Sequence, residues 1–338
     1  MRISRANYDA HTATIHLLLM LACCSLLCNV AFSQSAPPQE TSAGSTVVQE
    51  SFATPQSAAD ALIKALTDYN VPELTKIFGP DGKDFVTTAD PVQDKALAEA
   101  FVRKAQEKQS VTIDPKNGSR ATLVVGNDDW PFPVPIVKKS HKWSFDSKQG
   151  HNEILYRRIG ANELDAINVC RGFVEAQKEY AAQIHDDSGV NQYAQKIIST
   201  PGKQDGLYWK NADGTPGGPV SEAAARAIQE GYSLDSPSGY HGYYFKVLKG
   251  QGPAARLGQL DYVINGIMIG GFALVAVPAE YRITGVKTFI VSYDGVVYEK
   301  DMGPNSLDIA KNMDRYNPDK TWQVTNDELD DDDSVAQN

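Results

Sequence analysis

One apolar stripe follows residue 162 at the spacing of an α-helix, and it constrains the fold more than any other feature of the chain. Its members recur every three or four positions, which is typical of a helix with a single buried face. They are Ile167, Cys170, Phe173, Val174, Tyr180, Ala181 and Ile184. Asn162 is suited to cap this helix, with Glu163 and Asp165 in its first turn. A helix with such a stripe requires another layer of structure to cover it.

Runs of β-branched and aromatic residues after position 240 supply that layer. Strands are predicted at 243–248, 262–264, 271–277, 286–293 and 296–299. Asp294 and Gly295 stand between the last two runs, and Asp-Gly in this setting is a strong hairpin signal. Shorter helices are expected at 190–197 and 221–231, with a loop at 199–220. We therefore predict a C-terminal domain over residues 153–325, in which the long helix packs on an antiparallel sheet.

A separate N-terminal domain is predicted over residues 52–152. Thr54 and Pro55 form a helix start, because threonine caps well and proline fits the first helical position. Helical patterns continue to about residue 101, and then the period changes to that of short strands separated by turns. Helices followed by a small antiparallel sheet are the order of an NTF2-like cone. Both domains together give an α+β fold class.

The first 33 residues have the layout of a secretory signal peptide. Arg2 and Arg5 precede an apolar run over 15–30, and residues 31–33 fit a cleavage site of small side chains. Residues 20–23 resemble a lipoprotein box, but cutting there would fall early in the apolar run, so lipid anchoring is the less favoured alternative. We therefore expect export and a periplasmic or extracellular location.

Two further segments are expected to lie outside the folded domains. Residues 34–51 are polar and rich in Pro, Ser and Thr, which is typical of a flexible leader. Residues 326–338 carry a block of acidic side chains and are predicted to form a disordered tail. The most apolar run of the remaining chain, residues 264–277, is too short to cross a bilayer, so no transmembrane span is predicted after cleavage.

Charge and cysteine content exclude some functions. The formal net charge is −10, which repels phosphate backbones and argues against nucleic acid as a partner. Cys170 is the one cysteine outside the signal segment, so no internal disulfide can form after cleavage. A nucleophilic role for Cys170 is the weaker alternative, because its place on the apolar stripe predicts a buried thiol.

His241 is the candidate catalytic residue. It lies in "SGYHGYYFKVLKGQG", and an imidazole there could act as general base if Asp205, Asp235 or Asp261 approached it. The alternative interpretation is a turn that enters a strand, with the aromatic rings packing on a core edge. The chain shows no Gly-x-Ser-x-Gly elbow, no His-Glu-x-x-His motif and no phosphate loop.

Aromatic and acidic residues of the second domain form two further candidate sites. A binding surface for an envelope component or extracellular polymer is predicted from Tyr208, Trp209, Tyr240, His241 and Tyr243. Oxygen ligands in "HDDSGVNQ" raise the alternative of a calcium site, formed by Asp186, Asp187 and Asn191. A helix–helix turn explains the same residues more simply, so no cofactor is predicted and calcium stays an alternative.

Long segments also resemble a known family. They are "FATPQSAADALIKAL", "YRRIGANELDAINVCRGFVEAQKEYAA", "YAQKIISTPGKQDGLYW", "GYHGYYFKVLKGQGPAA" and "GGFALVAVPAEYRITGVKTFIVSYDGVVYEKDMGP". In this order they resemble the bacterial secreted domain-of-unknown-function 2950 family (DUF2950). The resemblance implies no activity, cofactor or catalytic residue. The second half also resembles a pilin-type domain, although the prepilin cleavage pattern is missing and a whole domain precedes the helix.

These observations favour a secreted envelope protein that acts as a non-catalytic binding or structural module. The alternative is a hydrolase of a cell-wall or extracellular polymer, with His241 as general base.

Overall fold

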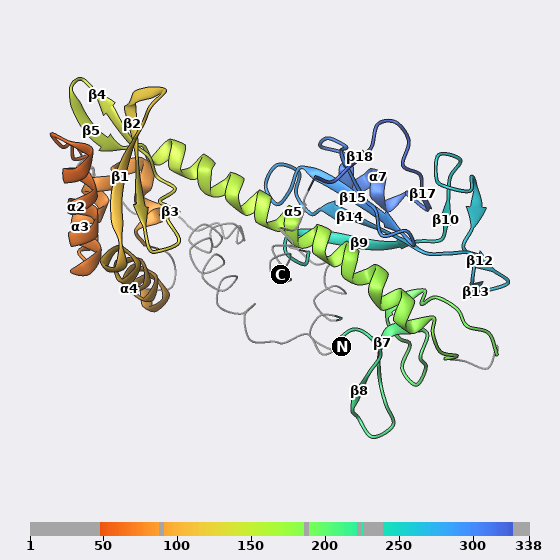
Figure 1. Ribbon diagram of the computed structural model, residues 1–338. Coiled ribbons are helices and arrows are strands. Elements are labelled where there is room, and N and C mark those ends of the chain that lie inside the picture. Colours follow the sequence, from red (N-terminus) through yellow and green to blue (C-terminus); the bar gives the residue numbers. More distant parts are fainter. Residues whose placement is uncertain (1–47, 88–90, 186–188, 222–224, 226–238, 327–338) are drawn as a thin grey trace, which may run out of the picture. The chain divides into compact units, whose positions relative to one another are not determined.

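The computed structural model describes residues 48–87, 91–185, 189–221, 225 and 239–326 (Figure 1). The predicted signal peptide, nearly all of the predicted leader and tail, and most of the helix predicted at 221–231 lie outside the described residues. The chain divides into two compact units, Met1–Arg157 and Arg158–Asn338. The fold class is α+β, as the sequence predicts.

The N-terminal unit opens with helices. They are α2 (Pro55–Thr67), α3 (Val71–Phe78), the 3-10 helix η2 (Pro80–Phe85) and α4 (Pro91–Glu107). Thr54 caps α2 as predicted: its hydroxyl accepts from the Ser57 amide at 3.0 Å, and the Ser57 hydroxyl accepts from the Thr54 amide. This reciprocal pair satisfies two amides that the first helical turn would otherwise leave without partners.

An antiparallel sheet follows the helices. Its strands are β1 (Gln109–Asp114), β2 (Asn117–Val125), β3 (Trp130–Pro131), β4 (Ile136–Lys139) and β5 (Lys142–Phe145). The order is β1-β2-β4-β5, and β3 pairs with β2. One face of β2 is buried, because Ala121, Leu123 and Val125 alternate with more exposed residues. The helices pack their apolar faces against this sheet.

Gln49, which precedes the predicted N-terminal domain at Phe52, also contacts this unit. The Gln49 side-chain amide donates to the Phe145 carbonyl at 2.7 Å and to the Ile77 carbonyl at 3.1 Å. Phe52 and Trp143 then exchange two backbone hydrogen bonds. These contacts tie the end of the predicted leader to the sheet and to α3.

Helix α5 spans Ser147–Tyr180, and the boundary between the two units falls within it. The predicted helix cap at Asn162 is therefore wrong, because Asn162 lies in the interior of α5. The predicted stripe is buried at Ile167, Cys170 and Phe173, whereas Ile184 beyond the helix is exposed.

The main sheet of the C-terminal unit is antiparallel and has the order β18-β16-β15-β14-β9. Its strands are β9 (Tyr243–Leu248), β14 (Ala273–Pro278), β15 (Lys287–Ser292), β16 (Val297–Asp301) and β18 (Gln323–Val324). The predicted hairpin at Asp294 and Gly295 is confirmed, since it joins β15 to β16. Helix α7 (Ser306–Lys311) contacts β14.

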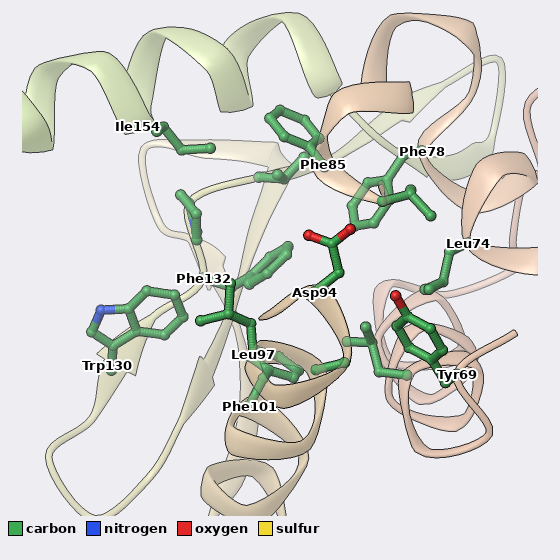
Figure 2. Close-up of a pocket in the computed structure, with 15 residues that line it drawn as sticks. Tyr69, Leu74, Phe78, Phe85, Asp94, Leu97, Phe101, Trp130, Phe132 and Ile154 are labelled. Carbon is green, nitrogen blue, oxygen red and sulfur yellow. The ribbon is translucent and has the colours of Figure 1, made fainter. Parts of the chain in front are cut away.

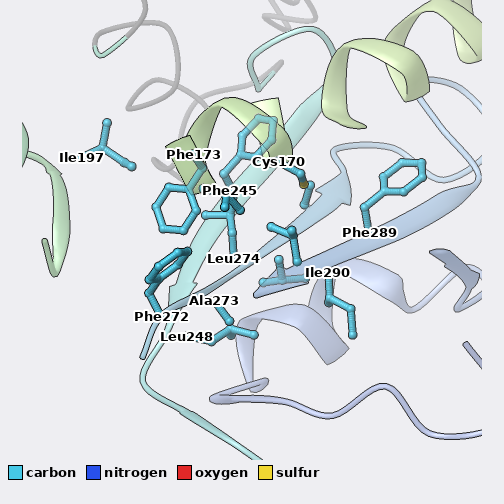
Figure 3. Packing of buried hydrophobic residues seen from close by; sticks show 14 of the residues in the cluster. Cys170, Phe173, Ile197, Phe245, Leu248, Phe272, Ala273, Leu274, Phe289 and Ile290 are labelled. Atoms are coloured by element: carbon cyan, nitrogen blue, oxygen red, sulfur yellow. The ribbon is translucent and has the colours of Figure 1, made fainter. Parts of the chain in front are cut away.

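The α5 stripe packs on this sheet, as Figure 3 shows for Cys170 and Phe173 beside side chains of β9, β14 and β15. The Phe173 and Phe272 rings meet edge to face, with centroids 5.7 Å apart. Strand β14 is buried along its whole length, because α5 and α7 residues join it in one apolar cluster.

Shorter strands surround the main sheet. They are β6 (Lys196–Ile198), β7 (Gly206–Lys210), β8 (Pro216–Gly217), β10 (Gly250–Gln251), β11 (Leu260–Asp261), β12 (Val263–Ile264), β13 (Ile267–Met268) and β17 (Arg315–Tyr316). The helix predicted at 190–197 is therefore wrong, and the loop predicted at 199–220 contains β7 and β8. Buried Gln177 of α5 explains the first difference, because its amide group bonds both the carbonyl and the amide of Ala194.

Candidate functional site

His241 occupies a two-residue hairpin turn at the entrance to β9. Tyr240 and Tyr243 exchange two backbone hydrogen bonds, of 2.9 and 3.0 Å, across this turn. His241 and Gly242 both have positive φ, 48° and 73°, as a type I′ turn requires. A Cβ at Gly242 would lie 2.7 Å from the side-chain amide of Asn162. The positive φ and the lack of room for a side chain therefore both favour glycine at this position.

Asp165 of α5 is the acidic partner of His241. The imidazole Nδ1 lies 2.6 Å from the Asp165 carboxylate, and the two side chains are 31% and 29% exposed. Of the three carboxylates that the sequence suggested, Asp205 and Asp261 pair with other residues and Asp235 lies outside the described residues. The structure thus forms a His–Asp pair, but with a carboxylate that the sequence placed in the first turn of a helix.

The same stretch of α5 is hydrogen-bonded to the segment that leads into β15. The Asn162 side chain donates to the Thr284 carbonyl at 2.8 Å. The Glu163 carboxylate accepts from the amides of Val286 and Lys287, at 2.8 and 3.0 Å. Charge-assisted bonds of this kind hold backbone in place more firmly than neutral ones. His241 and Asp165 therefore lie on a well-anchored part of the fold.

The two tyrosines that flank the turn have different surroundings. Tyr240 is partly buried, and its ring meets the His241 ring edge to face with centroids 4.2 Å apart. Burial, and then the charge of Asp165, raise the pKa of the Tyr240 hydroxyl. Tyr243 is fully buried, and its hydroxyl donates to the Lys287 carbonyl at 2.8 Å. Burial above all raises the pKa of Tyr243, which serves the core and does not face solvent.

Tyr208 and Trp209, the other members of the predicted binding surface, lie in β7. Tyr208 is buried in the main core. Trp209 is partly buried and packs against Tyr180 and His185, with ring centroids 6.4 and 5.2 Å away. His185 in turn stacks on Tyr180 at 4.0 Å.

The predicted binding residues therefore fall into two groups along α5. One group surrounds Asp165, and the other surrounds Tyr180 at the end of the helix. At 1.5 Å per residue, Tyr180 lies about 22 Å farther along the helix axis than Asp165. The structure brings Tyr240 to His241, but it does not gather the five residues on one surface.

The predicted calcium ligands are only partly described. Asp186 and Asp187 lie outside the described residues. The Asn191 side-chain amide donates to the Ala181 carbonyl at 2.9 Å. Among the residues that the structure covers, no three His, Cys, Asp or Glu side chains are grouped as metal ligands would be. Cys170 is fully buried, and burial raises the pKa of its thiol to about 12.

A hollow in the N-terminal unit is the candidate site that the sequence did not indicate. Its volume is about 750 Å³ including solvent at its mouth, and the centres of water molecules could occupy about 90 Å³ of it. Six aromatic rings from the part of the chain that the structure describes take part in its lining. They belong to Tyr69, Phe78, Phe85, Phe101, Trp130 and Phe132 (Figure 2).

Asp94 places a carboxylate in this apolar hollow. It lies in the first turn of α4 and is 5% exposed. Figure 2 shows its carboxylate pointing from the end of α4 into the space between Phe132 and Phe78. Tyr69 contributes a hydroxyl to the lining, and burial followed by the charge of Asp94 raises the pKa of that hydroxyl.

One local signal could have indicated this site. Asp94 stands three positions before Leu97 and seven before Phe101, so it lies on the buried face of α4 rather than on its solvent face. Val92 and Ala96, which the sequence suggested as apolar positions of this helix, are exposed. A charged residue on the apolar face of a helix is uncommon unless it has a partner or a function.

A family model described as "Protein of unknown function (DUF2950)" matches residues 49–325. No curated protein and no solved structure matches the chain. The NTF2-like and pilin-like comparisons therefore stay predictions. No helix in the described part of the chain is both long enough and apolar enough to span a bilayer.

Proposed function

We propose, from the premise that this chain belongs to the DUF2950 family of proteins of unknown function, that it is an exported binding module without catalytic activity. Its ligand is a small, largely apolar molecule held in the hollow of the N-terminal unit. The observation that carries the proposal is the aromatic lining of that hollow, with the Asp94 carboxylate at its wall. The signal-peptide layout of residues 1–33 supports export.

The size and lining of the hollow match a ligand site better than a packing defect. Protein interiors leave few voids larger than one water molecule. The accessible volume of about 90 Å³ is several times the roughly 10–15 Å³ that one water molecule needs, so the hollow exceeds an ordinary packing void. Apolar walls with a few polar groups are typical of small-molecule sites, since the apolar area supplies affinity and the polar groups supply orientation. A ligand with one aromatic ring fits this description.

A neutral single-ring probe tests the proposal. Benzyl alcohol should bind with a Kd of about 1 mM, at roughly −0.5 kcal/mol for each of its eight non-hydrogen atoms. We expect it to shift the NMR signals of Leu97, Trp130 and Val134, which line the hollow. Titration of the uniformly labelled full chain would provide the Kd.

Two variants of α4 make the test specific. Ala98→Leu adds three carbons inside the hollow and should abolish binding, whereas Ala96→Leu makes the same change on the exposed face and should leave it intact. Absence of binding to the unmodified chain, or equal binding to Ala98→Leu, would refute the proposal.

A second candidate function rests on the pairing of His241 with Asp165 at 2.6 Å. A carboxylate on Nδ1 orients an imidazole for general-base work, which favours the alternative of a hydrolase acting on an extracellular polymer. This candidate predicts turnover of at least one substrate in a panel of glycoside, ester and peptide substrates. Turnover should disappear in His241→Gln and persist in His185→Gln. A panel without turnover would remove the hydrolase from consideration.

A further inference from the structure

We infer that the ligand of the hollow is an organic cation, with an amine attached to an aromatic or otherwise apolar body. This inference rests on the proposed function and names its ligand class. Of the described residues that line the hollow, Asp94 alone carries a formal charge. Its position inside an apolar wall sets the sign of charge that the site accepts.

The aromatic rings reinforce the same preference. The face of an aromatic ring carries partial negative charge, so cations are attracted to it within about 6 Å of the centroid. Phe78 and Phe132 flank the Asp94 carboxylate in Figure 2, and Phe85 lies close to them. A cation beside Asp94 would thus lie next to a carboxylate and among aromatic rings at once, whereas an anion would be repelled by the carboxylate.

Tyr69 adds a hydrogen-bonding group without adding charge. Burial and the neighbouring Asp94 raise the pKa of its hydroxyl, so it stays protonated at neutral pH. A neutral hydroxyl can accept a hydrogen bond from an ammonium group as well as donate one. The polar groups of the hollow therefore match an amine and do not match a carboxylate or phosphate.

Helix stabilisation is the competing explanation for Asp94. A carboxylate in the first turn of α4 interacts favourably with the positive end of the helix dipole, whatever occupies the hollow. This explanation predicts a loss of stability in Asp94→Asn, but no difference between charged and neutral ligands. Ligand selectivity therefore separates the two explanations.

Three probes of nearly equal size provide the experiment: benzylamine, benzyl alcohol and benzoate. Each is titrated into the full chain and followed by the NMR signals of residues that line the hollow. We expect benzylamine to bind about tenfold or more tightly than benzyl alcohol, the ratio typical of a hydrogen bond to a charged group, and benzoate not to bind. Asp94→Asn should remove the preference for benzylamine. Asp60→Asn, on the exposed face of α2, should retain it.

Each outcome decides a different question. If benzyl alcohol or benzoate binds as tightly as benzylamine, the cation inference fails while the hollow remains a ligand site. If none of the probes binds, the proposed function fails as well. A preference that persists in Asp94→Asn would overturn the assignment to Asp94. If that variant does not fold, the three affinities of the unmodified chain still test the charge preference.

Discussion

Chemical labelling of Cys170 tests how tightly α5 packs on the main sheet. The thiol lies on the buried face of α5, is fully inaccessible, and faces β-strand side chains in Figure 3. Burial raises the pKa of this thiol from 9.0 to about 12, against a smaller opposite effect of Arg171. The thiolate is the reactive form, so both access and ionisation should slow its reaction with a disulfide reagent.

The ionisation effect alone is large. At pH 8, a thiol of pKa 9.0 is about 10% thiolate, whereas one of pKa about 12 is about 0.01% thiolate. The reactive thiolate should therefore be roughly 1,000-fold less populated than in an exposed thiol, and steric protection should slow the reaction further. Unfolding exposes the Cys170 thiol and allows it to react faster, so denaturant should raise the labelling rate.

The assay uses the chain from Gln34 onward, in which Cys170 is the sole cysteine. Release of a chromogenic thiol from the reagent gives the rate. Glu175→Cys in a Cys170→Ala background is the matched control, because the Glu175 side chain is 74% exposed on the same helix. Equal rates for Cys170 and the control without denaturant would refute the described packing of α5 on the sheet.

Two further predictions concern the C-terminal unit. Gly285→Ala should lower the free energy of unfolding by about 1–3 kcal/mol, because its Cβ would lie 2.2 Å from the Tyr243 hydroxyl. Gly172→Ala should instead raise the free energy of unfolding by about 0.5–1 kcal/mol, because Gly172 lies in α5 with open space around it. Urea denaturation that ranks the two variants the other way would contradict this prediction. Burial raises the pKa of Asp205, but hydrogen bonds from a lysine and a threonine outweigh it and lower the pKa below 3.8. Asp205→Asn should therefore be less stable than the unmodified chain at pH 7, and the difference should shrink as the pH falls below 3.8; a difference that does not change with pH would contradict it.

Features fixed by neighbouring residues were predictable from the sequence. Thr54 caps α2 because its hydroxyl and that of Ser57 are three residues apart, and the hairpin at Asp294 and Gly295 needs only the turn preference of those two residues. In both cases the physical cause lies within one turn of backbone. The α5 stripe was predictable for the same reason, since the helical period places its apolar residues on one face.

Features fixed by distant residues were not predictable. Asn162 has the chemistry of a helix cap, but its amide donates to a carbonyl of residue 284, and α5 continues through it. Residues 190–197 have a helical pattern, yet Gln177 bonds the Ala194 backbone and holds it in another conformation. Local propensity is a weak preference, and these long-range hydrogen bonds of buried side chains override it.

The candidate sites show the same division. His241 was predictable as a turn residue, but its partner Asp165 was not, because the pairing depends on where α5 crosses the turn before β9. The hollow forms where α3, α4 and the β3–β4 segment meet, so no single segment encodes it. Only Asp94 gave a local signal, as a charge on the buried face of a helix.

The two aspartates also explain why the ligand proposal depends on Asp94 rather than on Asp165. The Asp165 side chain is 29% exposed, so water screens a charge brought near it. Asp94 is 5% exposed and faces aromatic rings. The interaction between two charges strengthens as water is removed from their surroundings, so Asp94 distinguishes the sign of a ligand's charge more sharply than a surface carboxylate does. The same carboxylate would disfavour an anion by the same physics, which is why charge selectivity is the most sensitive measurement of what this site binds.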